Sequence, residues 1–201
     1  MRKTALLTVV LATLFVVTDL AAQPHQVPPL GDIAASLPPI TGTDGTVALP
    51  LDGSPPWTWR PVRDGVEVQS ADGALEVSYQ VQTGQPAGAA LVIPPGTLKD
   101  LDHLQVALSG NRNAQLSITL RDAEGAVFSF PAVPVRVGKA RRAEVFAEDL
   151  TFFAPQAEVP DPGAFDPART VMITLLDISG FMGSETPHVS WKVESLQTVT
   201  P

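Results

Sequence analysis

Apolar and polar residues alternate along most of the chain after about residue 60. The runs 75–82 and 189–193 place an apolar residue at every second position. Such period-two alternation predicts strands that bury one face and expose the other, as antiparallel sandwich strands do. The same alternation recurs in five further runs, at residues 66–69, 104–108, 115–120, 133–137 and 171–175.

Short turn signals separate these runs. An acidic residue followed by Gly stands at 64–65, 72–73 and 124–125, and a polar turn follows Gly110. Pro131 and Pro134 predict an edge strand, because proline cannot donate an amide hydrogen bond. No stretch shows a sustained 3.6-residue apolar stripe. The predicted fold class is therefore all-β, a single antiparallel β-sandwich of jelly-roll type at residues 51–201.

The first 50 residues follow a different pattern. Residues 1–22 combine Arg2 and Lys3 with an apolar run and small residues at Ala21 and Ala22, the layout of a secretory signal peptide. The alternative is a retained membrane anchor, although the apolar run is shorter than the roughly 20 residues that span a bilayer. Residues 23–50 are Pro-rich and predict a partly disordered linker. We expect a secreted or periplasmic protein with no membrane insertion after signal cleavage.

Composition limits the available chemistry. The chain has no Cys, which excludes disulfide scaffolds, Cys-ligated zinc and thiol catalysis. Its formal net charge of −8 argues against nucleic acid as a partner, because cationic patches supply most of that attraction. No Gly-x-Ser-x-Gly elbow, phosphate loop or dinucleotide fingerprint is present. We therefore expect no enzyme activity, catalytic residue or cofactor. A hydrolase with paired carboxylates stays open, since their separation is a three-dimensional quantity.

Two tryptophans precede the first long alternating run. Trp57 and Trp59 are two residues apart, so on an extended strand their indoles point to the same face. With Arg60 they would form a platform on which a sugar ring stacks. The alternative is that one or both indoles close the end of the core. Trp191 is in phase with the apolar residues of its run, so we expect it in the core.

The turn at 111–113 supplies a second set of candidate contacts. Asn111, Arg112 and Asn113 carry amide and guanidinium donors that suit hydroxyl groups or a carboxylate. The alternative is an ordinary polar hairpin turn. No metal is assigned to the carboxylates near turns, which lack the dense ligand spacing of an EF-hand: Asp100, Asp102, Asp122 and Glu124.

Four segments follow one another in an order shared by a known group of sandwiches. They are LDHLQVALSGNRNAQLSITLRDAEGAVFSF, VFAEDLTFF, DPARTVMITLLDISG and VSWKVESLQ. They resemble the central hairpin, the strand-to-loop step, the penultimate strand and the closing strand of galactose-binding-like jelly rolls. That group includes several carbohydrate-binding module families and the complex I intermediate-associated protein family. The resemblance covers residues 57–199, with Arg141 and Arg142 where many such modules carry a Trp.

These features predict an exported, non-catalytic binding module whose ligand is a carbohydrate or glycan. The alternative is a structural or assembly protein of the cell envelope that acts through protein–protein contacts. The sequence specifies neither the ligand nor the oligomeric state. The candidate ligand contacts are Trp57, Trp59, Arg60, Asn111, Arg112 and Asn113.

Overall fold

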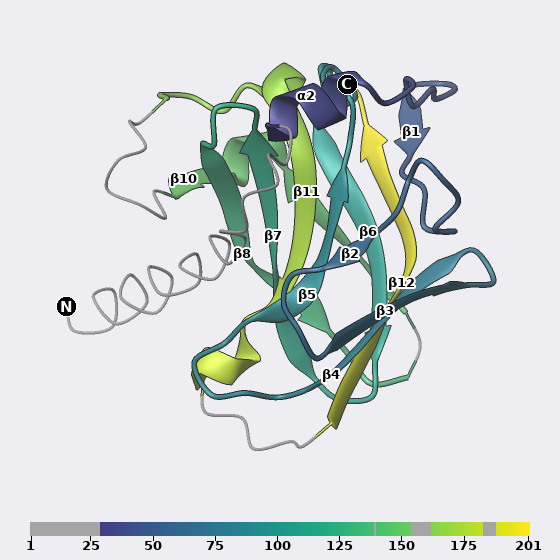
Figure 1. Ribbon diagram of the computed structural model, residues 1–201, viewed down its shortest axis with the longest axis vertical. Coiled ribbons are helices and arrows are strands. Elements are labelled where there is room, and N and C mark those ends of the chain that lie inside the picture. Colours follow the sequence, from purple (N-terminus) through teal and green to yellow (C-terminus); the bar gives the residue numbers. More distant parts are fainter. Residues whose placement is uncertain (1–28, 139, 154–161, 183–187) are drawn as a thin grey trace.

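Two antiparallel sheets pack face to face in the structure, a computed structural model that describes residues 29–138, 140–153, 162–182 and 188–201 (Figure 1). Among these residues the strands form two six-stranded sheets, called sheet A and sheet B below. Sheet A contains, in spatial order, β3 (Val66–Ala71), β4 (Ala74–Gln80), β12 (His188–Val199), β6 (His103–Gly110) and β9 (Arg141–Phe146), with β1 (Thr46–Ala48) also paired to β12. Sheet B contains β10 (Thr151–Phe153), β8 (Val127–Val135), β7 (Ala114–Asp122), β11 (Thr170–Asp177), β5 (Ala87–Val92) and β2 (Arg60–Pro61). The predicted all-β jelly-roll sandwich is confirmed.

The chain passes repeatedly from one sheet to the other. The last strand, β12, lies between β4 and β6 in the middle of sheet A, so the C-terminal segment closes that sheet. Residues 141–153 enter both sheets: β9 forms an edge of sheet A, a short 3₁₀ helix η2 (Ala147–Asp149) turns the chain, and β10 pairs with β8 in sheet B. Two further 3₁₀ helices flank β11, namely η3 (Pro167–Arg169) and η4 (Ser179–Met182).

The core lies between the sheets and follows the sequence alternation. Alternate residues of β6 and β7 point inward, and Leu104, Leu108 and Ile118 are completely buried. Each such side chain contributes about 1.5–3 kcal/mol of apolar burial relative to exposure. Trp191 on β12 is 1% exposed, which confirms its predicted place in the core.

A β-bulge changes the phase of β12 halfway along the strand. Val189, Trp191 and Val193 face inward, and after the register shift between Val193 and Ser195 the next buried apolar residue is Leu196. One extra residue moves the inward face from odd to even positions. The bulge therefore allows a twelve-residue strand to keep its apolar side on the core.

The turn between β3 and β4 and the proline-containing part of β8 both agree with the sequence pattern. Asp72 and Gly73 connect β3 to β4 with φ values of 53° and 74°, the left-handed conformation that a tight hairpin requires. The proline-containing half of β8 pairs with β7, whereas β10 pairs only with Val127–Ser129. Among the described strands, that half of β8 therefore lies at a sheet edge, where proline is tolerated.

The described part of the predicted linker packs on the sandwich. The helix α2 (Leu30–Ala35) lies at one end of the sandwich near β11, and its Ala34 is fully buried (Figure 1). The strand β1 pairs with β12, and Leu49 joins the core. The predicted signal peptide, residues 1–22, lies outside the described residues. None of the helices in the described ranges is both long and apolar enough to cross a bilayer.

Candidate functional site

Trp57 and Trp59 both pack against the core. Trp59 is 4% exposed, and its indole N–H donates a hydrogen bond to the Pro50 carbonyl at 2.8 Å. Trp57 is half-buried and contacts the same cluster of side chains. The two indoles thus share a side of the chain, as their spacing predicts. This placement favours the alternative in which they close the core, and it leaves Trp57 as the one with exposed surface.

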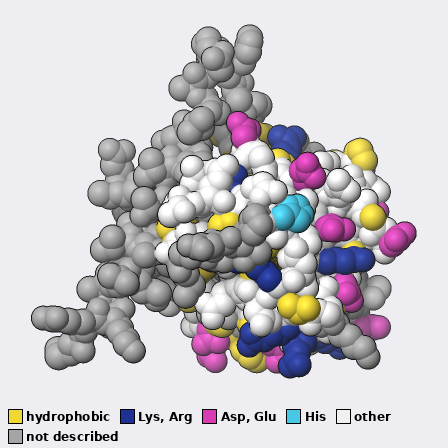
Figure 2. Space-filling model, turned by 90° about the horizontal axis from the view of Figure 1, so that it is seen from below, with side chains coloured by type: hydrophobic (Ala, Val, Ile, Leu, Met, Phe, Trp, Pro, Cys, Tyr) yellow, Lys and Arg dark blue, Asp and Glu magenta, His cyan; other side chains and the backbone are white. Residues whose placement is uncertain are grey.

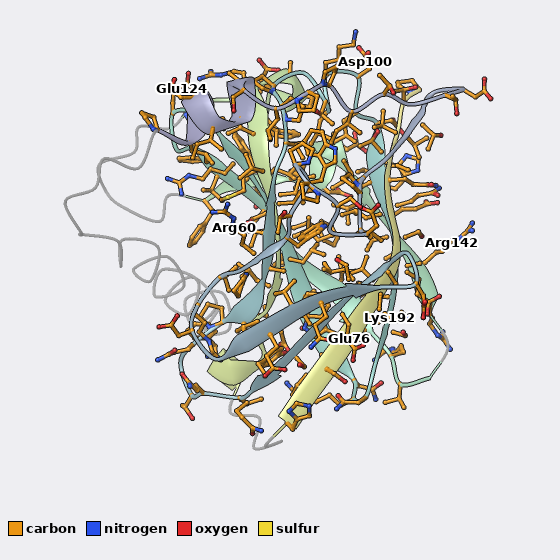
Figure 3. The ribbon with its side chains drawn as sticks, turned by 45° about the vertical axis from the view of Figure 1, so that its right-hand side comes forward. Arg60, Glu76, Asp100, Glu124, Arg142 and Lys192 are labelled. Carbon is orange, nitrogen blue, oxygen red and sulfur yellow. The ribbon has the colours of Figure 1, made fainter. Side chains whose placement is uncertain are left out.

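Arg60 lies on the outer face of sheet B. It is exposed at the edge strand β2, directly opposite Ala90 of β5. Figure 3 places it on the side of the sandwich away from Arg142 and Lys192, which belong to sheet A. Arg60 is therefore available to a ligand that approaches sheet B from outside.

In the turn between β6 and β7, the side chains of Asn111 and Arg112 bind other parts of the protein. The Asn111 side-chain amide donates to the His188 carbonyl at 3.4 Å, and its oxygen accepts the Ser190 N–H at 3.1 Å. Arg112 Nη2 lies 3.2 Å from Asp177 Oδ2, with only 14% of the arginine side chain exposed. Asn113 is exposed. The structure thus does not bring Arg112 and Arg60 together on one surface.

Asp177 is the centre of a buried polar network at this end of the sandwich. Its Oδ2 accepts hydrogen bonds from the Tyr79 hydroxyl and from Arg112, and its Oδ1 accepts the Ser179 N–H at 2.6 Å. Asp177 is 2% exposed, so its charge is balanced by Arg112 rather than by water. Asp177 is not among the residues that the sequence singles out, although it is in phase with the inward-facing Leu175. Seen from below in Figure 2, acidic and basic side chains are interspersed over the described surface at this end.

Tyr79 should not ionise while the protein is folded. Burial, followed by the negative charge of Asp177, raises the pKa of Tyr79 well above its usual value of about 10. Since the unfolded chain loses this proton near pH 10 and the folded chain does not, we expect stability to fall as the pH rises above about 10. Tyr79 is the only tyrosine, so phenolate absorbance reports on it alone. The native protein should show no phenolate step near pH 10, whereas the protein in urea should; a native step there would contradict the burial of Tyr79.

The register of sheet B aligns a row of six residues across its outer face, five of them with short side chains. Neighbouring strands pair residue to residue, and all six positions of the row face away from the core. Four of them carry hydroxyl groups, so we call it the hydroxyl row. Its members, in spatial order, are Arg60, Ala90, Thr174, Thr119, Ser129 and Thr151.

Longer side chains border the hydroxyl row on both sides. Met172 and Arg121 lie next to each other in the adjacent row, and on the other side Leu176 packs with Val62 and Phe181. Thr119, in the middle of the row, is 3% exposed, whereas Arg60 and Thr151 at its two ends are exposed. The centre of the row (Thr174, Thr119 and Ser129) is thus buried, and the row is accessible at its ends. The Nε atom of the Arg121 guanidinium group is buried and has no hydrogen-bond partner among the described residues.

This arrangement suits a polyhydroxylated ligand. Sugar rings present C–H faces to apolar side chains, while their hydroxyls exchange hydrogen bonds with hydroxyl, amide and guanidinium groups. The sequence analysis found Arg60 but missed Thr174, Thr119 and Arg121. Their outward phase could be read from the alternation, but their alignment depends on the strand register, which the alternation does not give.

The outer face of sheet A is different in character. His103 Nδ1 lies 2.7 Å from Asp102 Oδ2, and the His103 ring contacts the 37% exposed Phe146 at 5.1 Å between centroids. Two hollows of about 130 and 210 Å³ lie on this face. The first is lined mainly by polar and acidic side chains, namely Glu67, Ser78, Gln80 and His188. The second combines acidic and polar side chains with apolar ones, namely Asp52, Glu194, Ser195 and Gln197 with Ala48, Leu49, Leu51 and Leu196.

The carboxylates considered for a metal have other partners. Asp122 and Glu124 both pair with Arg169, at 3.5 and 2.6 Å, and the hydrogen bond from Arg169 lowers the pKa of Glu124. Asp100 pairs with Lys99 at 3.7 Å. Within the ranges that the structure describes, no three His, Asp or Glu side chains are grouped so that they could hold a metal ion.

Comparison with solved structures finds the same sandwich in carbohydrate-binding proteins. The family 11 carbohydrate-binding module from Clostridium thermocellum, solved in complex with a β-1,3-1,4-mixed-linked tetrasaccharide, is 12% identical over 79% of this chain and 98% of the module, with a TM-score of 0.55. The chain has the jelly-roll fold of this module. An agarase, AgWH50C, is 15% identical over 79% of this chain but only 25% of the agarase chain, also with a TM-score of 0.55. No protein-family model and no curated protein matches the chain.

The similarity agrees with one part of the resemblance drawn from the sequence. The fold expected from galactose-binding-like carbohydrate-binding modules is confirmed. The resemblance to the complex I intermediate-associated protein family stays a prediction. At identities of 12–15% the similarity concerns the jelly-roll fold, so the function must be argued from the chain's own residues.

Proposed function

We propose that this chain is an exported, non-catalytic module that binds a glycan on the outer face of sheet B. The observation that carries the proposal is the hydroxyl row, which is exposed at Arg60 and Thr151 and half-buried at Ala90, beside the half-buried Met172. A sugar chain at the accessible part of the row meets Ala90 and Met172 with its C–H faces, and its hydroxyls meet the guanidinium group of Arg60 or the hydroxyl of Thr151. Arg60 makes the primary polar contact at one end.

The other predicted contacts receive separate roles in this proposal. Trp57 faces the core as Trp59 does, so only its exposed part, at the edge of the sandwich next to Arg60, contacts the ligand, and Trp59 supports that segment from the core. Asn111 and Arg112 have a structural role: Asn111 donates a hydrogen bond to the His188 carbonyl, and Arg112 forms an ion pair with Asp177. Asn113, which is exposed, is a peripheral contact at most. The signal-like residues 1–22 support export to a secreted or periplasmic location, where a glycan is a suitable partner.

Binding to polysaccharides tests the proposal. The purified protein should be retarded in native gels that contain at least one soluble polysaccharide from a set of neutral and acidic glycans. It should release no reducing sugar from the polysaccharide that retards it. No retardation by any member of the set would contradict glycan binding, and release of reducing sugar would contradict a non-catalytic role.

A protein partner in the cell envelope is the second candidate. The edge strand β9 favours it, because β9 pairs with β6 on one side and carries the exposed Phe146. An edge strand with an exposed aromatic side chain is a common contact for another protein. This candidate requires co-purification with an envelope protein that Phe146→Ser abolishes, together with no affinity for glycans.

A further inference from the structure

The outward-facing residues of sheet B carry positive charge on an otherwise acidic protein. Their charged members among the described strands are Arg60 and Arg121, with no Asp or Glu. Asp122 and Asp177, at the strand ends, are buried and face inward. The chain as a whole has a formal net charge of −8, so this distribution departs from the average surface.

The outer face of sheet A provides the contrast. Its strands expose Glu67, Glu76, Glu144 and Glu194 beside Arg142 and a half-buried Lys192. Glu76 and Lys192 are directly opposite each other in the register of β4 and β12 (Figure 3). On the described outer face of sheet A acidic side chains thus outnumber basic ones, whereas the charged side chains on that of sheet B are basic.

The two arginines of sheet B are placed to act together on an extended ligand. Arg60 lies on β2 and Arg121 on β7, three strand spacings or about 14 Å apart across the sheet. The two acids that follow Arg121 in the chain have another partner, because Asp122 and Glu124 lie 3.5 and 2.6 Å from Arg169 Nη2. Arg121 is half-buried, and its Nε is buried with no hydrogen-bond partner among the described residues, so the rest of the guanidinium group is the part open to a ligand.

We propose that the outer face of sheet B binds an anionic polysaccharide, whose carboxylate or sulfate groups pair with Arg60 and Arg121 while its hydroxyls meet the hydroxyl row. This inference rests on the proposed function and adds the class of glycan to it. The planar guanidinium group binds carboxylate and sulfate oxygens through paired N–H donors. A polyanion is repelled by the remaining acidic surface, so its attraction is confined to this face.

Matched oligosaccharides separate charge from sugar identity. Isothermal titration would compare a galacturonate oligomer with its methyl-esterified form, which has the same sugar and no charge. A carrageenan oligomer and the corresponding unsulfated agaro-oligomer form the sulfate arm. We expect the charged member of at least one pair to bind about tenfold more tightly, and the arm in which this occurs identifies carboxylate or sulfate as the recognised group.

Variants locate the effect. Arg60→Gln should remove about tenfold of the affinity for the charged oligomer and leave the neutral member unchanged, whereas Arg60→Lys should retain part of it. Arg142→Gln, an equally exposed arginine on sheet A, is the control and should bind like the wild type. Equal loss in Arg60→Gln and Arg142→Gln would overturn the proposed site.

The outcomes also separate this inference from the proposed function. Binding of neutral oligomers as tightly as charged ones would overturn the anionic ligand but leave a glycan-binding module. Absence of binding to every charged and neutral oligomer would overturn both. Tighter binding of a charged member, lost in Arg60→Gln alone, supports both.

Discussion

Replacing Asp177 with asparagine is expected to lower the free energy of unfolding by about 3–5 kcal/mol. The substitution keeps the size of the side chain but removes the charge that balances Arg112, whose Nη2 lies 3.2 Å from the carboxylate. Because Asp177 is 2% exposed, water cannot take over that role. Urea unfolding followed by tryptophan fluorescence measures the change.

Two controls make the result specific to the buried charge. Asp100→Asn removes a carboxylate that pairs with Lys99 at the surface, where the side chains are 63% and 68% exposed, and should cost no more than about 1 kcal/mol. Replacing both Arg112 and Asp177 with leucine should cost less than Asp177→Asn, because no unpaired charge remains. Similar losses in Asp177→Asn and Asp100→Asn would show that the network is not important for stability.

Replacing Trp59 with alanine is expected to cost about 3–5 kcal/mol of unfolding free energy. The indole is 4% exposed and packs in the core, so its removal leaves a cavity and also strands the Pro50 carbonyl. Trp57→Ala is the matched comparison and should cost less, because Trp57 is half-buried. Unfolding in urea again provides the measurement.

Variants of Trp57 and Trp59 also decide whether these indoles form a platform for a sugar ring or only close the core. Trp59→Phe keeps most of the packing volume and should fold, with glycan affinity equal to that of the wild type. A folded Trp59→Phe protein that no longer binds glycan would instead place Trp59 in the ligand site. Loss of affinity in Trp57→Ala alone would support the platform role for Trp57 only.

Much of the fold could be predicted because burial on one face imposes period two on each strand. Residues 104–108 and 115–120 become β6 and β7 for this reason, and Trp191 is buried as its phase requires. The alternation did not reveal the bulge in β12 or the passage of residues 141–153 from sheet A to sheet B. Both depend on how strands pair, which is a property of the whole sandwich. The strand β1 lies in the Pro-rich segment and is too short to show alternation. It forms because it pairs with β12.

The candidate site was only partly accessible from the sequence. Arg60 was selected for its neighbours Trp57 and Trp59, yet its position opposite Ala90 is what places it on the sheet B face. Thr119 and Thr174 look like ordinary solvent-facing residues within their own strands. Only the register between β7 and β11 brings them together. Arg112 belongs to a polar turn in the sequence, but a buried carboxylate distant in the chain draws it inward.

Blocking one face of the sandwich tests the central claim most directly. Ala90 is half-buried in the hydroxyl row and faces outward from sheet B, and Ser78 is half-buried and faces outward from sheet A. Ala90→Trp and Ser78→Trp therefore place the same bulky side chain on opposite faces, and circular dichroism would check that both variants fold. We predict that Ala90→Trp lowers affinity for the bound glycan by at least about tenfold, or 1.4 kcal/mol, while Ser78→Trp binds like the wild type. Unchanged binding by folded Ala90→Trp, or loss in Ser78→Trp instead, would contradict a glycan site on sheet B.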